Sequence, residues 1–399
     1  MLSLLALGLF LASAQNSVSA QAVPQTIQLQ SRVAPVSATL RRRALNPVTV
    51  PLADFFLGTD LQWFGNKVTF SNSPAHFSGN MSVGTPPQTV SVVFDTGSST
   101  LEFASTLCGA PCDNQVKFNS AKSSTFVDGG TTSSITFSTG VGVDPVVGAN
   151  YRLTLRSGTD TVAIGNLKAP ATSLFLITNQ TAKFGIDPFS GIQGMSARAQ
   201  GIFAALISQG LPSLFSLFLT PLSVGNAEMT VGGIDTTKFT GPLTFASLAS
   251  TSAAWTLSSP QLTVNGVTNS VLQARRSIIF DSGTSNILFP TATANAMYAL
   301  ISSDITPFAA EPGAYGIACN KISTLPAVID ITFTSQSGSP FNLTIPSSEL
   351  NVGPFASNPA ICQTLINAFD GLSLVGGSLL KHYYSVWDVG NQRLGFAAI

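Results

Sequence analysis

Charged residues are scarce in this sequence. It contains 18 Lys and Arg and 18 Asp and Glu among 399 residues, and these cancel to a formal net charge of zero. Outside Arg41–Arg43 no run of basic residues could follow a phosphate backbone, which excludes nucleic-acid binding. The 44% of hydrophobic residues exclude a disordered chain, and this length allows two ordinary domains with large cores.

Histidine is almost absent, since only His76 and His382 occur. The sequence has no HExxH zinc motif and no G-x-S-x-G nucleophile turn, so it offers neither of these hydrolase sites. Both histidines are interpreted as ordinary structural residues. Neither a cofactor nor a bound metal is expected.

Cysteine is also scarce: Cys108 and Cys112 are close together, whereas Cys319 and Cys362 are far apart. Four cysteines allow three pairings, of which 108–112 with 319–362 is the local-first choice. A zinc site is the alternative, but the Cys-x3-Cys pair has no second such pair and no nearby histidine. Two disulfides are therefore expected, as in an exported protein.

Apolar runs long enough to span a membrane are missing as well. Residues 1–14, MLSLLALGLFLASA, are apolar and end in Ala-Ser-Ala, a small-x-small cleavage signal. A membrane anchor is the alternative, but fourteen residues fall short of the roughly 20 that a spanning helix needs. We expect a signal peptide, secretion and no membrane span. Sequons at Asn80, Asn179 and Asn342 are candidate glycosylation sites.

Residues 15–43 contain no acidic residue but carry Arg32 and the triplet Arg41-Arg42-Arg43. This pattern predicts a pro-segment with a basic processing site, and a basic arm that stays attached is the alternative. Removal of residues 1–43 would leave 14 basic against 18 acidic residues, a net charge of −4. We therefore expect a zymogen whose positive pro-segment loosens from an acidic body as carboxylates become protonated.

What the chain has instead is a succession of short strand-like runs. From about residue 67 these runs, such as TVSVVF, SSITFS and YRLTLR, are separated by Gly, Pro, Asn or Ser. The second half continues in the same way with MTVGGI, LTVNGV and VIDITF. Helical signals are few and are best at 197–210 and 291–304, where Thr291 could serve as the N-cap. An all-β fold with a few short helices is predicted.

One of these runs occurs twice. SVVFDTGSSTLEF (91–103) and SIIFDSGTSNILF (277–289) are identical at six of thirteen positions, around Asp95 and Asp281. A single D-[TS]-G-[ST] tetrapeptide can be a mere turn, because Asp accepts from nearby N–H groups and Gly adopts positive φ. Two copies 186 residues apart, each after an apolar strand, favour a duplicated all-β lobe.

Two such loops facing each other across a pseudo-twofold axis would bring the carboxyl groups together. Like charges at that distance cannot both ionise easily, so the pair would share a proton and titrate as a unit. One carboxylate could then deprotonate a bound water while the other carboxyl protonates a substrate carbonyl. The repeat therefore predicts a two-aspartate hydrolase.

The segments VVFDTGSS and IIFDSGTS resemble the two active-site loops of pepsin-like aspartic proteases. The likeness continues in order from about residue 76 through HFSGNMSVGTPPQ, LCGAPC, MTVGGIDTTKFTG and LVGGSLLKHYYSVWDVGNQRLGFA. It is closest in character to secreted eukaryotic members, and a fungal type is expected. It implies a bilobal double β-barrel with pseudo-twofold symmetry, with lobes at 67–222 and 223–399.

The resemblance also implies a role for each site residue. Asp95 and Asp281 would form the catalytic dyad of a monomeric endopeptidase that cuts polypeptides between bulky apolar residues at acidic pH. The supporting residues would brace the two loops, approach closely with their backbone, or bond the outer carboxylate oxygens: Thr96, Gly97, Ser98, Ser282, Gly283 and Thr284. The flap over the substrate would include Phe137, Ser138, Thr139 and Gly140.

Some positions depart from the family pattern. The flap usually has Tyr-Gly, whose phenol bonds a Trp shortly after the first aspartate, whereas this chain has Phe137-Ser138 and Glu102. Gln193 is polar in a usually hydrophobic pair, and the closing motif reads Val375-Gly376-Gly377. The alternative function is therefore a weakened or inactive relative that binds peptides or another enzyme. A structural surface protein is a third possibility.

Overall fold

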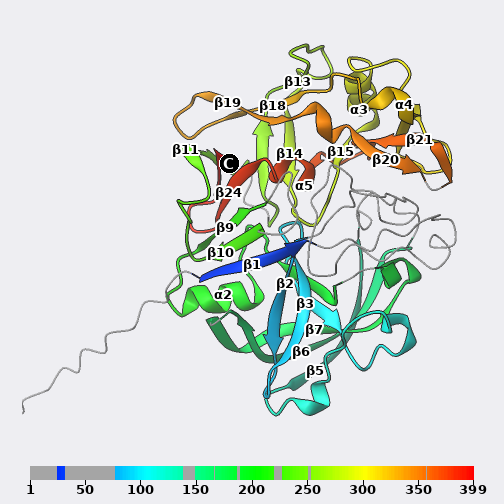
Figure 1. Cartoon of the computed structure of the whole chain (residues 1–399). Helices are drawn as coiled ribbons and strands as arrows, with labels where there is room; N and C mark the ends of the chain where they lie inside the picture. Colours follow the sequence, from blue (N-terminus) through cyan, green and yellow to red (C-terminus); the bar gives the residue numbers. More distant parts are fainter. Residues whose placement is uncertain are drawn as a thin grey trace, which may run out of the picture.

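The computed structural model describes residues 25–31, 77–137, 149–165, 167–186, 189–219, 227–249, 253–355 and 357–399. Within these ranges the protein consists mostly of β-strands with a few short helices, which confirms the predicted fold class (Figure 1). The predicted signal peptide and the Arg41–Arg43 processing site lie outside the described residues. No helix in the described ranges is long and apolar enough to cross a membrane.

Both expected helices form, but each is shorter than its sequence signal. They are α2 (Gly201–Ser208) and α3 (Thr291–Tyr298). Thr291 is the first helical residue rather than the N-cap, so that expectation was wrong. Asp370, 79 positions away, accepts a hydrogen bond from the Thr291 backbone N–H at 2.8 Å, and this partner could not be inferred from local sequence.

The first half of the chain forms a closed barrel. Strands β2 (Phe77–Val83), β3 (Gln88–Asp95), β8 (Gly191–Gly194), β4 (Leu101–Ala104), β7 (Leu167–Gln180) and β6 (Arg152–Ile164) are neighbours in that order. A further pairing of β2 with β6 closes the ring. β5 (Val127–Thr136) extends this sheet beyond β6. The apolar residues of β3 that precede Asp95 are buried in the barrel core, which fixes the backbone leading to the aspartate.

The second half repeats this strand order. β12 (Thr256–Ser259), β14 (Arg276–Phe280), β23 (Leu374–Val375), β15 (Ile287–Phe289) and β22 (Ile366–Ala368) follow one another as β2, β3, β8, β4 and β7 do. In each set the strand before the aspartate runs parallel to its next neighbour: β3 to β8 and β14 to β23. The sequence repeat is therefore also a repeat of strand topology.

A third layer joins the two halves (Figure 1). It is antiparallel, in the order β11 (Thr240–Ser247), β25 (Arg393–Ala398), β24 (Tyr383–Asp388), β9 (Leu214–Phe218), β10 (Ala227–Val231), β1 (Gln25–Ser31) and β2. Its core contains aromatic rings from both halves, in which Phe215 stacks on Trp387 and both contact Trp255 edge-on. Such contacts bury large apolar areas and fix the two halves together.

Strand β1 comes from the predicted pro-segment. It pairs with β10 from Gln25 to Leu29 and with β2 through Gln30 and Ser31. The segment expected to be removable is thus an interior strand of the joining sheet. The predicted lobe boundary at 222/223 lies outside the described residues and stays a prediction.

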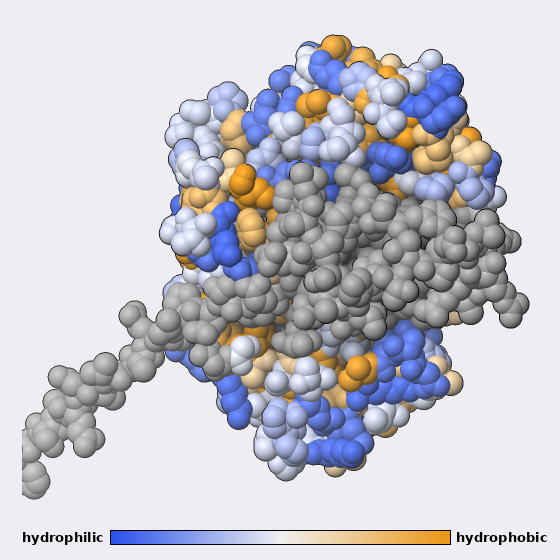
Figure 2. Space-filling view, viewed as in Figure 1, coloured by the Kyte–Doolittle hydropathy of each residue, from blue (hydrophilic) through white to orange (hydrophobic). Residues whose placement is uncertain are grey.

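The remaining strands build the far side of the second half, in the upper part of Figure 1. One sheet contains β13 (Leu262–Val264), β18 (Ile329–Thr334) and β19 (Pro340–Ile345), and the other contains β16 (Thr306–Pro307), β17 (Tyr315–Ala318), β21 (Asn358–Thr364) and β20 (Asn351–Phe355). The space-filling view, seen from the same side, shows hydrophilic and hydrophobic residues mixed over the upper and the lower part of the molecule (Figure 2).

Two disulfides are formed, with the local-first pairing. Cys108–Cys112 closes a short loop after β4, and Cys319–Cys362 connects α4 (Cys319–Ile322) to β21 across a separation of 43 residues. A disulfide stabilises mainly by restricting the unfolded chain, and the effect grows with the length of the loop.

Replacing both cysteines of one pair by alanine tests this difference. The loop-length relation predicts a loss of about 4 kcal/mol for Cys319 with Cys362 and about 2 kcal/mol for Cys108 with Cys112. Urea unfolding of the two double variants measures both values. An equal or larger loss at the short loop would contradict the entropic explanation.

Candidate active site

The two repeated aspartates lie at equivalent points of the two halves. Asp95 is the last residue of β3, and Asp281 follows directly on β14. The preceding residues are apolar and largely buried, so each chain enters its Asp-Thr/Ser-Gly turn on a fixed path. Both aspartates are themselves buried, at 8% and 6% exposure.

The two loops are tied together by reciprocal hydrogen bonds. The Thr96 N–H donates to Ser282 Oγ at 3.1 Å, and the Ser282 N–H donates to Thr96 Oγ1 at 2.9 Å. Each hydroxyl also donates onward to the opposite strand: Thr96 Oγ1 to the Phe280 carbonyl at 3.2 Å, and Ser282 Oγ to the Phe94 carbonyl at 2.7 Å. These four bonds obey the twofold relation between the loops and lie out of water.

In each loop the glycine two positions after the aspartate allows the carboxyl group of the other loop to approach closely. A Cβ atom on Gly97 would lie 2.6 Å from Asp281 Cγ, and one on Gly283 would collide with the Asp95 carboxyl. Each glycine also donates its N–H to its own aspartate, Gly97 to Asp95 Oδ1 and Gly283 to Asp281 Oδ1, both at 2.8 Å. Any larger residue at either position would force the two carboxyl groups apart.

The outer oxygens of the two aspartates are treated differently. Thr284 Oγ1 donates to Asp281 Oδ2 at 2.6 Å, as the resemblance implied. Ser98, its counterpart, has a buried Oγ that makes no hydrogen bond within normal limits. The twofold symmetry is therefore incomplete at these two positions.

The electrostatics favour a shared proton. Burial raises the pKa of Asp95 well above its usual range, and the charge of Asp281 and a hydrogen bond to it raise it further. The nearby Ser98 hydroxyl and the Gly97 N–H lower it to a lesser extent. Because the two groups interact strongly, the proton belongs to the pair rather than to one side chain.

Several residues that support the loops were not identified from the sequence. The Met195 N–H donates to the Asp95 carbonyl at 2.7 Å, and Trp255 Nε1 donates to the Met195 carbonyl at 2.7 Å, which connects the first loop to the second half. Gly194 is the last residue of β8 and Gly376 directly follows β23, at corresponding positions, and a Cβ on either would collide with the neighbouring aspartate loop. The shared glycine after two apolar segments was the available signal.

Gln193, flagged as a departure, is fully buried in β8. Its Nε2 donates to the Gly194 carbonyl at 2.7 Å, whereas its Oε1 has no partner. The polar residue is thus accommodated beside the loop with one unsatisfied oxygen. In the second half the equivalent residue is Val375, paired in register with Phe280.

The predicted flap is described only at Phe137, its first expected residue. Phe137 follows β5 and packs edge-on against Phe184, with ring centroids 5.7 Å apart. Ser138, Thr139 and Gly140 lie outside the described residues, so their assignment to the flap stays a prediction. Glu102, at the position where the family has Trp, is fully buried in β4.

Two of the three sequons can be placed. Asn179 lies on β7 and Asn342 on β19, and both are exposed to solvent, which is required for glycan attachment. Asn80 lies within β2, where only the backbone is described. Among the described residues, no group of three His, Cys, Asp or Glu side chains could hold a metal ion.

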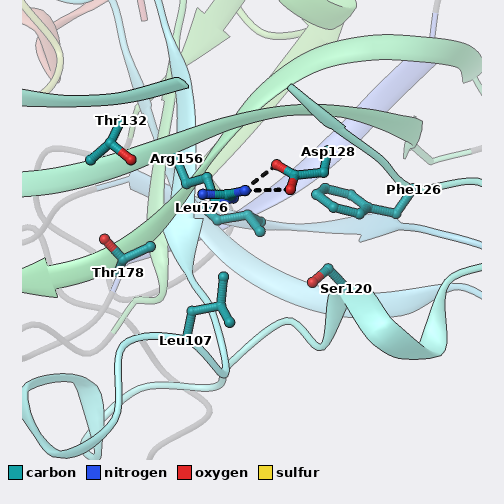
Figure 3. Close-up of a pocket in the computed structure, with 8 residues that line it drawn as sticks. All are labelled: Leu107, Ser120, Phe126, Asp128, Thr132, Arg156, Leu176 and Thr178. Atoms are coloured by element: carbon teal, nitrogen blue, oxygen red, sulfur yellow. Dashed lines mark hydrogen bonds and ion pairs between the residues drawn. The ribbon is translucent and has the colours of Figure 1, made fainter. Parts of the chain in front are cut away.

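A cavity of about 430 Å³ lies elsewhere in the first half and contains no residue of the two loops (Figure 3). Its lining combines apolar and hydroxyl-bearing side chains with the ion pair Asp128–Arg156. Arg156 Nε donates to Asp128 Oδ1 at 2.8 Å and so joins β5 to β6. The pair thus links the two strands that flank Phe137 in the sequence.

Comparison with known proteins points to one family. A family model described as eukaryotic aspartyl protease matches residues 76–399. Similar proteins include an aspartic protease of Phaffia rhodozyma, 31% identical over 83% of this chain and 78% of its own length. They also include pepsin A of Suncus murinus, 30% identical over 81% of each chain, and pepsin A of Rhinolophus ferrumequinum, 27% identical over 97% of this chain and 93% of its own. These relatives do not single out a fungal type, which stays a prediction.

The reciprocal hydrogen bonds can be tested with a matched pair of serine variants. Ser282→Ala leaves the Thr96 N–H and the Phe94 carbonyl without their buried partner, so we expect a loss of about 1–3 kcal/mol for each group left unsatisfied. Ser285→Ala, in the same loop, removes a buried hydroxyl that has no partner and should change stability little. Denaturant unfolding of both variants measures the difference, and equal losses would show that the cross-loop bonds contribute nothing specific.

Proposed function

This chain belongs to the eukaryotic aspartyl protease family, and from that membership we propose that it is a secreted aspartic endopeptidase that cuts polypeptides at acidic pH. The observation that carries the proposal is the pair of buried carboxyl groups, each packed against the glycine of the opposite loop. Site geometry rather than fold must decide function, since one fold can host several activities.

The proposed reaction uses one proton held by the pair. The ionised carboxylate accepts a proton from a water molecule, whose oxygen attacks the carbonyl carbon of the scissile peptide. The protonated carboxyl gives its proton to the carbonyl oxygen, and a tetrahedral diol forms. Transfer of a proton to the amide nitrogen then breaks the C–N bond, which releases a carboxylic acid and an amine. The net change is the addition of one water molecule.

The raised pKa of Asp95 supports this division of roles. A carboxyl that keeps its proton above the usual range of an aspartic acid can act as an acid while its partner is ionised. As the pH rises, the pair loses the one proton that it shares. The acid is then lost, so activity should fall on the alkaline side. As the pH falls far enough to protonate both groups, the base is lost.

We propose Phe137 and the segment after it as the cover over bound peptide. Phe137 has no hydroxyl and Glu102 has no indole, so the bond between flap and strand that the family resemblance implies cannot form here. Apolar contact remains, because Phe137 packs on the aromatic cluster around Phe184. We accordingly expect substrates with bulky apolar residues at the cleavage point.

Export and processing are part of the proposal. The apolar stretch 1–14, the two disulfides and the exposed sequons support secretion. The basic triplet Arg41–Arg43 supports cleavage of a pro-segment. We propose that the mature protein is a monomer.

A binding function without turnover is the second candidate, favoured by the changed pair Phe137 and Glu102. The complete D-[TS]-G-[ST] loops favour the enzyme, because binding alone does not require two carboxyl groups to share a proton. Incubating the full chain at pH 3–4 with a denatured protein substrate separates the two: cleavage supports the enzyme, and retention of intact substrate supports the binding protein.

Substitution of the aspartates tests the mechanism itself. Asp95→Asn and Asp281→Asn should each abolish cleavage, and the double variant should be scarcely worse than either, because groups acting as a unit are not additive. Peptide hydrolysis measures kcat/KM, and circular dichroism checks that each variant is folded. Substantial turnover by a folded single variant would exclude the shared-proton mechanism.

A further inference from the structure

Glu102 has an unusual environment for an acidic residue. It lies in β4 with no exposed surface, and neither carboxyl oxygen has a hydrogen-bond partner. Among the buried acidic residues that the structure describes, no other leaves both oxygens unpaired. Asp160, for example, accepts from Thr125 Oγ1 at 2.6 Å, and Glu349 is paired with Lys381 at 2.7 Å. An unpaired buried carboxyl costs free energy even when it is neutral, and far more when it is ionised.

The strand register shows what surrounds this carboxyl. Side chains alternate along β4, so Glu102 and Ala104 share one face while Leu101 and Phe103 face the barrel core. Ala104 belongs to an apolar group that we call the flap-base cluster, because Phe137 and Phe175 pack against it. Phe175 is the residue of β7 directly beside Glu102. The other members of the cluster are Cys108, Cys112, Tyr151, Leu153, Leu155, Ile177 and Phe184.

No charged group compensates Glu102. On the other neighbouring strand, β8, its register partner is Ile192. The members of the cluster carry no acidic or basic side chain, and its phenol belongs to Tyr151. Basic residues nearby in the first half are Arg152 and Arg156 on β6 and Lys183 just after β7. The two arginines bond exposed partners on β5 instead, and Lys183 is only partly buried. Burial is the largest influence on the Glu102 carboxyl.

We propose that Glu102 is a built-in pH latch: protonated, it packs as a neutral residue beneath the flap base, and on ionising it opens this part of the first half and inactivates the protein. The latch does not depend on the catalytic proposal, because it acts on folding and is read without substrate. It would restrict the protein to acidic surroundings even if the dyad itself were still correctly protonated.

The direction of the effect follows from proton linkage. Burial raises the pKa of Glu102 from 4.5 to about 7, and the opposing effect of the Thr100 hydroxyl does not cancel this rise. Between these values the unfolded chain has released its proton while the folded protein still holds it. Stability is therefore full below pH 4.5 and falls as the pH rises to about 7. Over this window the ratio of folded to unfolded chain should decrease roughly 300-fold.

The test is thermal unfolding of the full chain from pH 4 to pH 8, with and without Glu102→Gln. All samples carry Asp281→Asn, so that self-digestion cannot be mistaken for unfolding. The parent Tm should fall steeply between pH 4.5 and 7.5. The side chain in Glu102→Gln cannot ionise, so the Tm of this variant should fall less, and only through the other titrating groups. The two curves should therefore cross, with the parent at least as stable at pH 4 and the variant more stable at pH 8.

Two further variants make the result decisive. Asp113→Asn removes the same charge from an exposed carboxylate, whose side chain is 71% accessible, and its Tm curve should run parallel to that of the parent. Glu102→Met replaces the carboxyl by an apolar chain of similar length and serves in place of the glutamine variant if that one does not fold. Curves for the Glu102 variants parallel to the parent curve, or a parent Tm that does not fall between pH 4.5 and 7.5, would overturn the latch.

Discussion

The structure depends on bringing two carboxyl groups into contact away from water. Such an arrangement is unfavourable on its own, since burial and mutual repulsion both oppose ionisation. It persists because the surrounding backbone is over-determined: the hydroxyls of Thr96 and Ser282 bind the opposite loop, and the glycines admit the opposite carboxyl. The proposed function follows from the same conflict, because a pair that cannot hold two charges must hold a proton.

The twofold arrangement explains why so much of the molecule is duplicated. One loop alone would have no partner for its hydroxyl and no carboxyl to accommodate beside its glycine. Each half therefore repeats the same set of strands, with the aspartate strand parallel to its neighbour. The repeat is not perfect, and its exceptions, Ser98 against Thr284 and Gln193 against Val375, lie next to the loops. They leave the inner hydrogen bonds intact.

Features with a local or repeated signal could be predicted from the sequence. The apolar run before each aspartate and the turn residues after it determine strand, loop and carboxyl position, and the structure brings the two aspartate loops together. Other features depend on residues far apart in the chain. Asp370 caps α3, Trp255 supports the Met195 carbonyl, and Glu102 becomes buried because β7 and β8 lie on either side of it. No periodicity in the sequence predicts such contacts, because each depends on how distant segments pack in three dimensions.

The position of strand β1 has a consequence for the proposed maturation. It occupies a slot between β10 and β2 rather than an outer margin of the sheet. If it left, two rows of backbone donors and acceptors would lose their partners at once, and the joining layer would present a groove that accepts any extended peptide of suitable length. Cutting the chain after Arg43 is therefore not equivalent to releasing the segment before it. The severed strand would remain bound until another strand displaced it, and the rate of that exchange, rather than the rate of cleavage, would determine when the precursor ceases to exist.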